Sequence, residues 1–128
     1  MLRFEALALA ISALNGGLHD PGSKAFLLCN PLMLKSYKPE KKTDSDNYRV
    51  FTTVMGGFKA GIAELQARCD GKNHRLSKEN TLRDLLSLYG IRTDSEIRKI
   101  FLFLRRALQD ETIHASTKLS FFIEAGKE

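Results

Sequence analysis

The chain of 128 residues lacks the short motifs that most often identify an enzyme or a cofactor site. It has no glycine-rich loop followed by Lys-Ser or Lys-Thr, no His-Glu-x-x-His helix and no serine at a nucleophile elbow. Its histidines, His19, His74 and His114, are scattered, and a scattered histidine is more often a surface or core residue than a ligand. The sequence therefore indicates no metal site and no cofactor.

Cysteine is also scarce. The chain has two, Cys29 and Cys69, far apart in the sequence. Two thiols are too few for a disulfide scaffold or a four-ligand cysteine zinc site. We expect both to behave as small buried hydrophobic residues, while a single disulfide between them stays open as an alternative.

A long apolar run is missing as well. The most apolar stretch is the N-terminus, where eleven of the first fourteen residues are apolar. A bilayer-spanning helix needs about 20 such residues, and Arg3 beside Glu5 is a weak basic start for a secretory signal. We therefore expect a buried helix here, with no membrane span and no clear signal peptide.

The overall composition is that of one globular domain covering residues 1–128. Apolar residues make up 43% and charged residues 27% of the chain, which is enough to build a core and too apolar for disorder. The 20 basic residues exceed the 15 acidic ones, giving a net charge of +5. This excess favours an anionic partner such as nucleic acid, anionic lipid or an acidic cell-wall polymer, although an ordinary surface can carry the same charge.

The apolar spacing predicts a mainly α-helical fold. A first helix is expected from Leu2 to Leu14; because it is apolar on nearly all sides, it should lie at the centre of the fold. It should end at Asn15-Gly16-Gly17, since glycine readily adopts the left-handed conformation that closes a helix.

A second helix is predicted up to Gly71. Its apolar residues recur at spacings of three and four: Phe51, Val54, Met55, Phe58, Ile62, Leu65 and Cys69. The pattern also contains Gly56, Gly57 and Gly61, each of which costs about 1 kcal/mol relative to alanine. Their presence suggests that another backbone packs closely against this helix.

Three more helices are predicted in the C-terminal half. One is capped by Asn80 or Thr81 and closed by Gly90. The next opens at Thr93–Glu96, which has capping-box spacing, and its apolar stripe comprises Ile97, Ile100, Phe101, Leu104 and Leu108. A short last helix is expected from about Thr117 to Ala125.

A small β-hairpin is predicted at about residues 32–53. Arg49–Thr53 is rich in β-branched and aromatic residues, and Leu32–Tyr37 is the candidate partner strand. The polar run 38–47 would connect the two.

Basic residues decorate the predicted helix after Thr93. Arg98, Lys99, Arg105 and Arg106 could meet a phosphate backbone. No aromatic residue is expected between them on the polar face, and no known nucleic-acid-binding module is present. A solvated helix face is the simpler interpretation.

Most of the chain, residues 4–108, resembles a known family. The order is a helix ending at Asn15-Gly16, then Pro21-Gly22-Ser23, then Asn30-Pro31 and Leu34-Lys35; the segments Phe51–Leu65 and Thr81–Leu85 continue the pattern. Over residues 4–108 the chain resembles the small lysozyme-fold proteins of phage virions and prophages, which are related to soluble lytic transglycosylases. The resemblance implies a lysozyme-like helical domain that acts on or binds peptidoglycan, in a virion or in the bacterial cytoplasm or envelope.

The resemblance also implies where a catalytic acid would stand. In the family a Glu at the end of the first helix protonates the glycosidic oxygen, and here Asn15 occupies that position. A carboxamide does not titrate in this range and cannot replace the acid. The best substitute is Asp20, just past the break, and Glu64 could project from the second helix into a groove. Asn15, Asn30 and Tyr37 are the candidate substrate-binding residues.

Other departures weaken the expectation of a working cleft. Asn30-Pro31 is followed by Leu32-Met33, where the family has Gly-Asn. The segment Tyr89–Ser95 replaces an aromatic-Ala-Pro stretch and an Asn-Asp-Thr.

Three hypotheses follow from the sequence. The chain is an inactive lysozyme-like domain with a structural or binding role toward peptidoglycan or other virion subunits, an active hydrolase with a substitute acid such as Asp20, or a basic adaptor for nucleic acid or protein.

Overall fold

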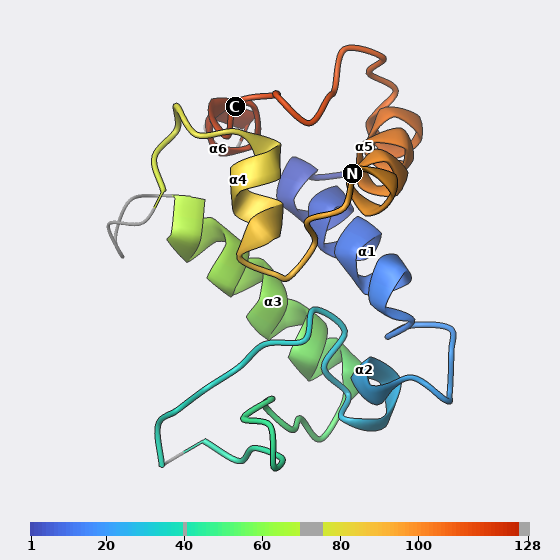
Figure 1. Ribbon diagram of the computed structural model, residues 1–128, viewed down its shortest axis with the longest axis vertical. Helices are drawn as coiled ribbons and strands as arrows, with labels where there is room; N and C mark the ends of the chain where they lie inside the picture. Colours follow the sequence, from blue (N-terminus) through green and yellow to red (C-terminus); the bar gives the residue numbers. More distant parts are fainter. Residues whose placement is uncertain (40, 70–75, 126–128) are drawn as a thin grey trace.

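The structure, a computed structural model, describes residues 1–39, 41–69 and 76–125. Features predicted for residues 70–75, including Gly71 and His74, lie outside the described residues. The described part is mainly helical (Figure 1), with α1 (Arg3–Asn15), α2 (Lys24–Leu27), α3 (Val54–Cys69), α4 (Leu82–Ser87), α5 (Asp94–Leu108) and α6 (Ser120–Ala125). None of these helices is both long enough and apolar enough to cross a bilayer.

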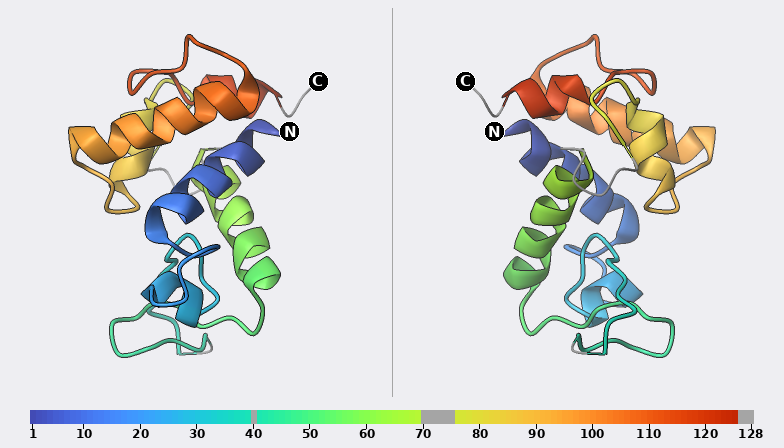
Figure 2. Two further views of the ribbon diagram at one scale, coloured as in Figure 1. Left: turned by 90° about the vertical axis from the view of Figure 1, so that its right-hand side faces the viewer. Right: turned by 90° about the vertical axis from the view of Figure 1, so that its left-hand side faces the viewer.

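Helix α1 is the central element, as predicted. It packs against α5, α3 and α6, and Figure 2 shows α5 and α3 crossing it on different sides. Ala6, Leu7, Ala8 and Ile11 have no exposed surface. Its alanines let neighbouring helices approach closely, and its larger side chains fill the space between them.

Helix α3 begins later than predicted, at Val54 instead of Phe51. The Thr53 side chain accepts a hydrogen bond from the Gly56 N–H at 3.0 Å, so Thr53 caps the first turn. The prediction that Met55 is buried is wrong, because its side chain is 61% exposed. The buried face is instead the stripe of Gly57, Gly61, Leu65 and Cys69.

Two of the three glycines in α3 explain this change of face. A Cβ atom on Gly57 would overlap the carbonyl oxygen of Cys29, and one on Gly61 would come within 2.6 Å of the Leu32 side chain. The prediction of close backbone packing is therefore confirmed at Gly57, and Gly61 admits a buried leucine. Gly56 is exposed, and a Cβ there would meet only Thr53.

The helices of the C-terminal half agree with the predicted order. Thr81 caps α4 through a complete capping box with Asp84. Thr93 caps α5 by accepting from the Glu96 N–H, but the Thr93 hydroxyl also donates to the Glu96 carboxylate at 2.8 Å, so only half of the predicted box forms.

Helix α6 is shorter than predicted and covers the start of α1. The Arg3 guanidinium donates to the Phe121 carbonyl at 2.6 Å. The Phe4 and Phe122 rings have centroids 6.0 Å apart. These contacts bring the two ends of the described chain together.

The predicted β-hairpin is present only as isolated pairing. No strand forms among the described residues; two antiparallel bridges, Lys35–Tyr48 and Thr43–Arg49, lie in this region. Met33 has a φ of 54° and Asn47 a φ of 67°. These left-handed residues interrupt the extended backbone that longer strands would need.

We predict that Gly57→Ala lowers the free energy of unfolding by about 1–3 kcal/mol, because the new methyl group must displace the Cys29 backbone. Gly56→Ala is the matched control, with an expected change below about 1 kcal/mol. Urea unfolding followed by circular dichroism measures both. Equal effects of the two substitutions would contradict the close contact at Gly57.

Candidate functional site

The end of α1 is a closed helix terminus. Gly16 has a φ of 77°; its N–H donates to the Ala13 carbonyl, and the Gly17 N–H donates to the Ser12 carbonyl. This pair of bonds satisfies two carbonyls at the helix end. The predicted break at Asn15-Gly16-Gly17 is confirmed, and it brings the chain back toward residues 29–32.

Asn15 holds this terminus against the segment that follows α2. Its side-chain amide donates to the Pro31 carbonyl at 3.1 Å, and the side chain is half-buried. A Cβ atom on Gly17 would come within 2.6 Å of the Pro31 Cα. Asn15 therefore acts as a tie between two backbone segments that already lie in close contact.

Asp20 shapes the turn between α1 and α2. Its carboxylate accepts from the Gly22 N–H at 3.0 Å, and its carbonyl accepts from the Ser23 N–H and hydroxyl. Ser23 in turn caps α2. Asp20 is exposed, and its carboxylate serves to shape this turn.

Asn30 is a buried structural residue. It has no exposed surface. Its side-chain amide donates to the carbonyls of Leu34 and Arg49, each at 2.9 Å, and its side-chain oxygen accepts from the Leu34 N–H. In this conformation the side chain is inaccessible to a sugar, so the expected role in substrate binding gives way to a role in joining the two sides of the hairpin region.

Tyr37 and Glu64 lie in contrasting surroundings. Tyr37 is 76% exposed on the connection that follows Lys35. The Glu64 carboxylate accepts from the Arg68 Nε at 2.9 Å and from the Tyr89 hydroxyl at 3.1 Å. Burial raises the pKa of the Tyr89 phenol, and the Glu64 charge adds to the effect. Glu64 thus belongs to a polar contact between α3 and the residues after α4.

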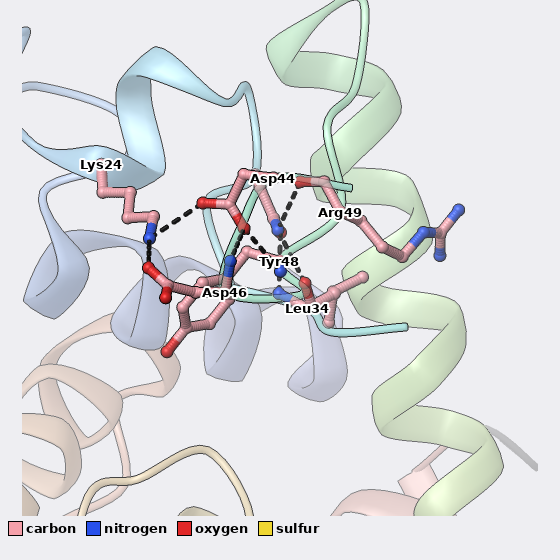
Figure 3. Close-up of polar contacts among 7 residues, drawn as sticks. Lys24, Leu34, Asp44, Asp46, Tyr48 and Arg49 are labelled. Atoms are coloured by element: carbon pink, nitrogen blue, oxygen red, sulfur yellow. Dashed lines mark hydrogen bonds and ion pairs between the residues drawn. The ribbon is translucent and has the colours of Figure 1, made fainter. Parts of the chain in front are cut away.

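A second polar cluster holds the loop 41–48 against α2 (Figure 3). The Lys24 ammonium lies 2.8 Å from the Asp44 carboxylate and 2.6 Å from that of Asp46. Asp44 also accepts from the N–H groups of Asp46 and Tyr48. The hydrogen bond from Lys24 lowers the pKa of Asp44. The ion pairs of Lys24 with Asp44 and Asp46 therefore hold this loop against α2.

The outward face of α5 differs from its prediction. Two adjoining hollows lie there, one lined by Lys99, Leu102, Phe103, Arg106 and Ala107, the other by Ala10, Ala13, Leu14, Lys99, Ile100 and Phe103. The expectation that no aromatic residue lies between the basic residues is wrong, because Phe103 is 37% exposed between Lys99 and Arg106.

One of the four basic residues of α5 is engaged within the fold. The Arg105 Nε donates to the Ile113 carbonyl at 2.8 Å, and its guanidinium lies 4.8 Å from the centre of the Phe101 ring. Arg105 is therefore committed to holding residues 113–114, and Arg98, Lys99 and Arg106 remain exposed.

The two cysteines are not joined. Cys29 is a free thiol at a half-buried position, and Cys69 is buried. Within the described ranges, no three His, Cys, Asp or Glu side chains are grouped in a way that could hold a metal ion.

Comparisons of this chain with protein-family models, with curated proteins and with solved structures find no match.

We predict that Asn15→Asp makes stability depend on pH in a new way. The protonated carboxyl can donate to the Pro31 carbonyl, but the carboxylate cannot, so the aspartate pKa is raised in the folded state. The contact is then present below the unfolded-state pKa and is lost as the pH rises through the folded-state pKa, which costs about 1–3 kcal/mol near neutral pH. Thermal unfolding across the acid range measures this. Asn15→Ala is the control, and its loss of stability relative to the natural chain should be the same at every pH. If the loss in Asn15→Asp were also independent of pH, this would contradict the hydrogen bond from Asn15 to Pro31.

We also predict that the loop 41–48 loosens in acid. Because the pKa of Asp44 is lowered, its contribution is present above the unfolded-state pKa and is lost as the pH falls through the folded-state value. The Tyr48 amide resonance should report this titration by NMR. Lys24→Met should move the midpoint upward, whereas Lys59→Met, at an exposed position on α3, should leave it unchanged. An unchanged midpoint in Lys24→Met would remove the ion pair from the explanation.

Proposed function

We propose that this chain is a non-catalytic lysozyme-like domain that serves as a binding or structural component, with a phage or prophage particle as its setting. The observation that carries the proposal is Asn15. The resemblance places the general acid of the family at this position, and here a carboxamide stands there and donates to the Pro31 carbonyl. The position has a structural use that requires an N–H donor.

Glycosidic cleavage needs a carboxylic acid that can protonate the leaving oxygen. The two carboxylates considered as substitutes are both engaged elsewhere. Asp20 is exposed and accepts from the Gly22 N–H within its turn. Glu64 accepts from Arg68 and Tyr89. Both carboxylates are thus occupied by hydrogen bonds within the fold, and this supports a role without hydrolysis.

The local architecture supports the lysozyme-like part of the proposal. A central helix ends in a glycine break, a buried asparagine holds the start of a hairpin-like segment, and a glycine-containing helix follows. This is the order of elements on which the resemblance rests. A domain that keeps this order of elements without the catalytic acid would keep the fold and lose the ability to cleave glycosidic bonds.

The proposal predicts that the purified chain releases no soluble fragments from peptidoglycan. The assay follows reducing ends and the turbidity of a cell-wall suspension, with an active lysozyme as positive control. Asp20→Asn should be indistinguishable from the natural chain. Turnover by the natural chain would refute the proposal, and its loss in Asp20→Asn would assign the acid to Asp20.

A further inference from the structure

The α1–α5 groove is the surface bounded by Ala13, Leu14, Lys99, Leu102, Phe103 and Arg106. Its α5 side carries Lys99, Leu102, Phe103 and Arg106 at successive spacings of three, one and three, which places them on one helix face. The end of α1 forms the opposite side, and Figure 2 shows the two helices side by side. The two hollows share Lys99 and Phe103 and therefore adjoin each other.

The groove is apolar along its floor and open to a ligand. Leu102 is 41% and Phe103 37% exposed, although α5 buries Ile97, Ile100 and Leu104 in the core. The hollows measure about 540 and 310 Å³, within the range of about 300–1,000 Å³ that is usual for ligand sites. An exposed apolar face of this kind gains free energy when a partner covers it.

The rim of the groove is positively charged. Lys99 and Arg106 line it, and no acidic residue lines either hollow. Within the described part of the chain, neither cation has a carboxylate partner, whereas Lys24, Arg68, Arg83 and Lys118 are all paired with carboxylates. The unpaired rim charges complement a partner that carries carboxylates beside an apolar stripe.

We propose that the α1–α5 groove docks an acidic amphipathic segment of a partner protein, whose apolar side chains would fill the hollows while its carboxylates pair with Lys99 and Arg106. This rests on the proposed function, because it gives the binding role a site. The concave shape favours an inserted segment over a membrane, which would need protruding apolar side chains. Two rim cations beside an apolar floor are few for a nucleic-acid backbone, which binds through many phosphate contacts.

The test uses the full ¹⁵N-labelled chain and a synthetic helical peptide with a leucine stripe flanked by glutamates. We expect the peptide to shift the resonances of the groove residues. A second peptide with lysine in place of every glutamate should bind about tenfold more weakly, since the charge pairing then becomes repulsion.

Two pairs of variants locate the contact. Phe103→Ser should weaken binding about tenfold, whereas Met55→Ser, which removes a more exposed side chain from α3, should not. Lys99→Glu/Arg106→Glu should abolish the preference for the glutamate peptide, whereas Lys41→Glu/Lys59→Glu makes the same change in net charge elsewhere and should preserve it. A dispersed NMR spectrum for each variant shows that it is folded.

The proposal is overturned if the glutamate peptide does not bind, if both peptides bind equally, or if the shifted resonances lie outside the groove. Vesicles with and without phosphatidylserine and an oligothymidylate are tested in parallel; binding of either in place of the peptide would assign the groove to a membrane or to nucleic acid and overturn the proposal. Peptidoglycan turnover measured on the same preparation tests the proposed function separately, because peptide binding and turnover can each fail without the other.

Discussion

Residues 29–32 fit between the end of α1 and the first half of α3 because glycine occupies positions 17, 57 and 61. A side chain at Gly17 would meet Pro31, and one at Gly57 would overlap the Cys29 carbonyl. This contact determines which face of α3 is buried and fixes the end of α1 against residues 29–32. It also brings the Pro31 carbonyl within reach of Asn15. The hairpin region depends on the same segment, because the side-chain amide of Asn30 donates hydrogen bonds to the carbonyls of Leu34 and Arg49.

The same constraint bears on function. The side chain at position 15 must donate a hydrogen bond to the Pro31 carbonyl. A carboxylate there would be repelled by the carbonyl oxygen, which is consistent with the lack of an acid at this position. The groove on α5 is independent of this region in its chemistry. It lies between α1 and α5, and its lining combines apolar side chains with Lys99 and Arg106. We therefore separate the site that the resemblance points to from the surface that is suited to binding.

Much of the fold could be predicted because its signals are local. The break after Asn15, the caps Thr81 and Thr93, and the apolar stripes of α1 and α5 follow from residue type and spacing. The prediction of the buried face of α3 fails at Met55. Which face is buried depends on the contact between Gly57 and Cys29, and Cys29 is distant in sequence. The hairpin pairing was anticipated, but the left-handed residues Met33 and Asn47 that shorten it were not.

The candidate site was less predictable for the same reason. The hydrogen-bond partners of Asn30 cannot be identified from the sequence. The folded chain shows that Asn30 is buried and hydrogen-bonded to Leu34 and Arg49. The α5 groove did leave a signal, since Lys99, Leu102, Phe103 and Arg106 have helical spacing and Leu102 and Phe103 fall outside the buried stripe; its other wall, from α1, required the tertiary structure.

The most direct measurement for the central claim is NMR observation of the Asn15 side-chain amide in the natural chain. The account predicts a slowly exchanging amide proton with nuclear Overhauser contacts to Pro31, unchanged when peptidoglycan fragments are added. A rapidly exchanging amide without contact to Pro31, or one that shifts with the fragments, would contradict the structural role assigned to Asn15.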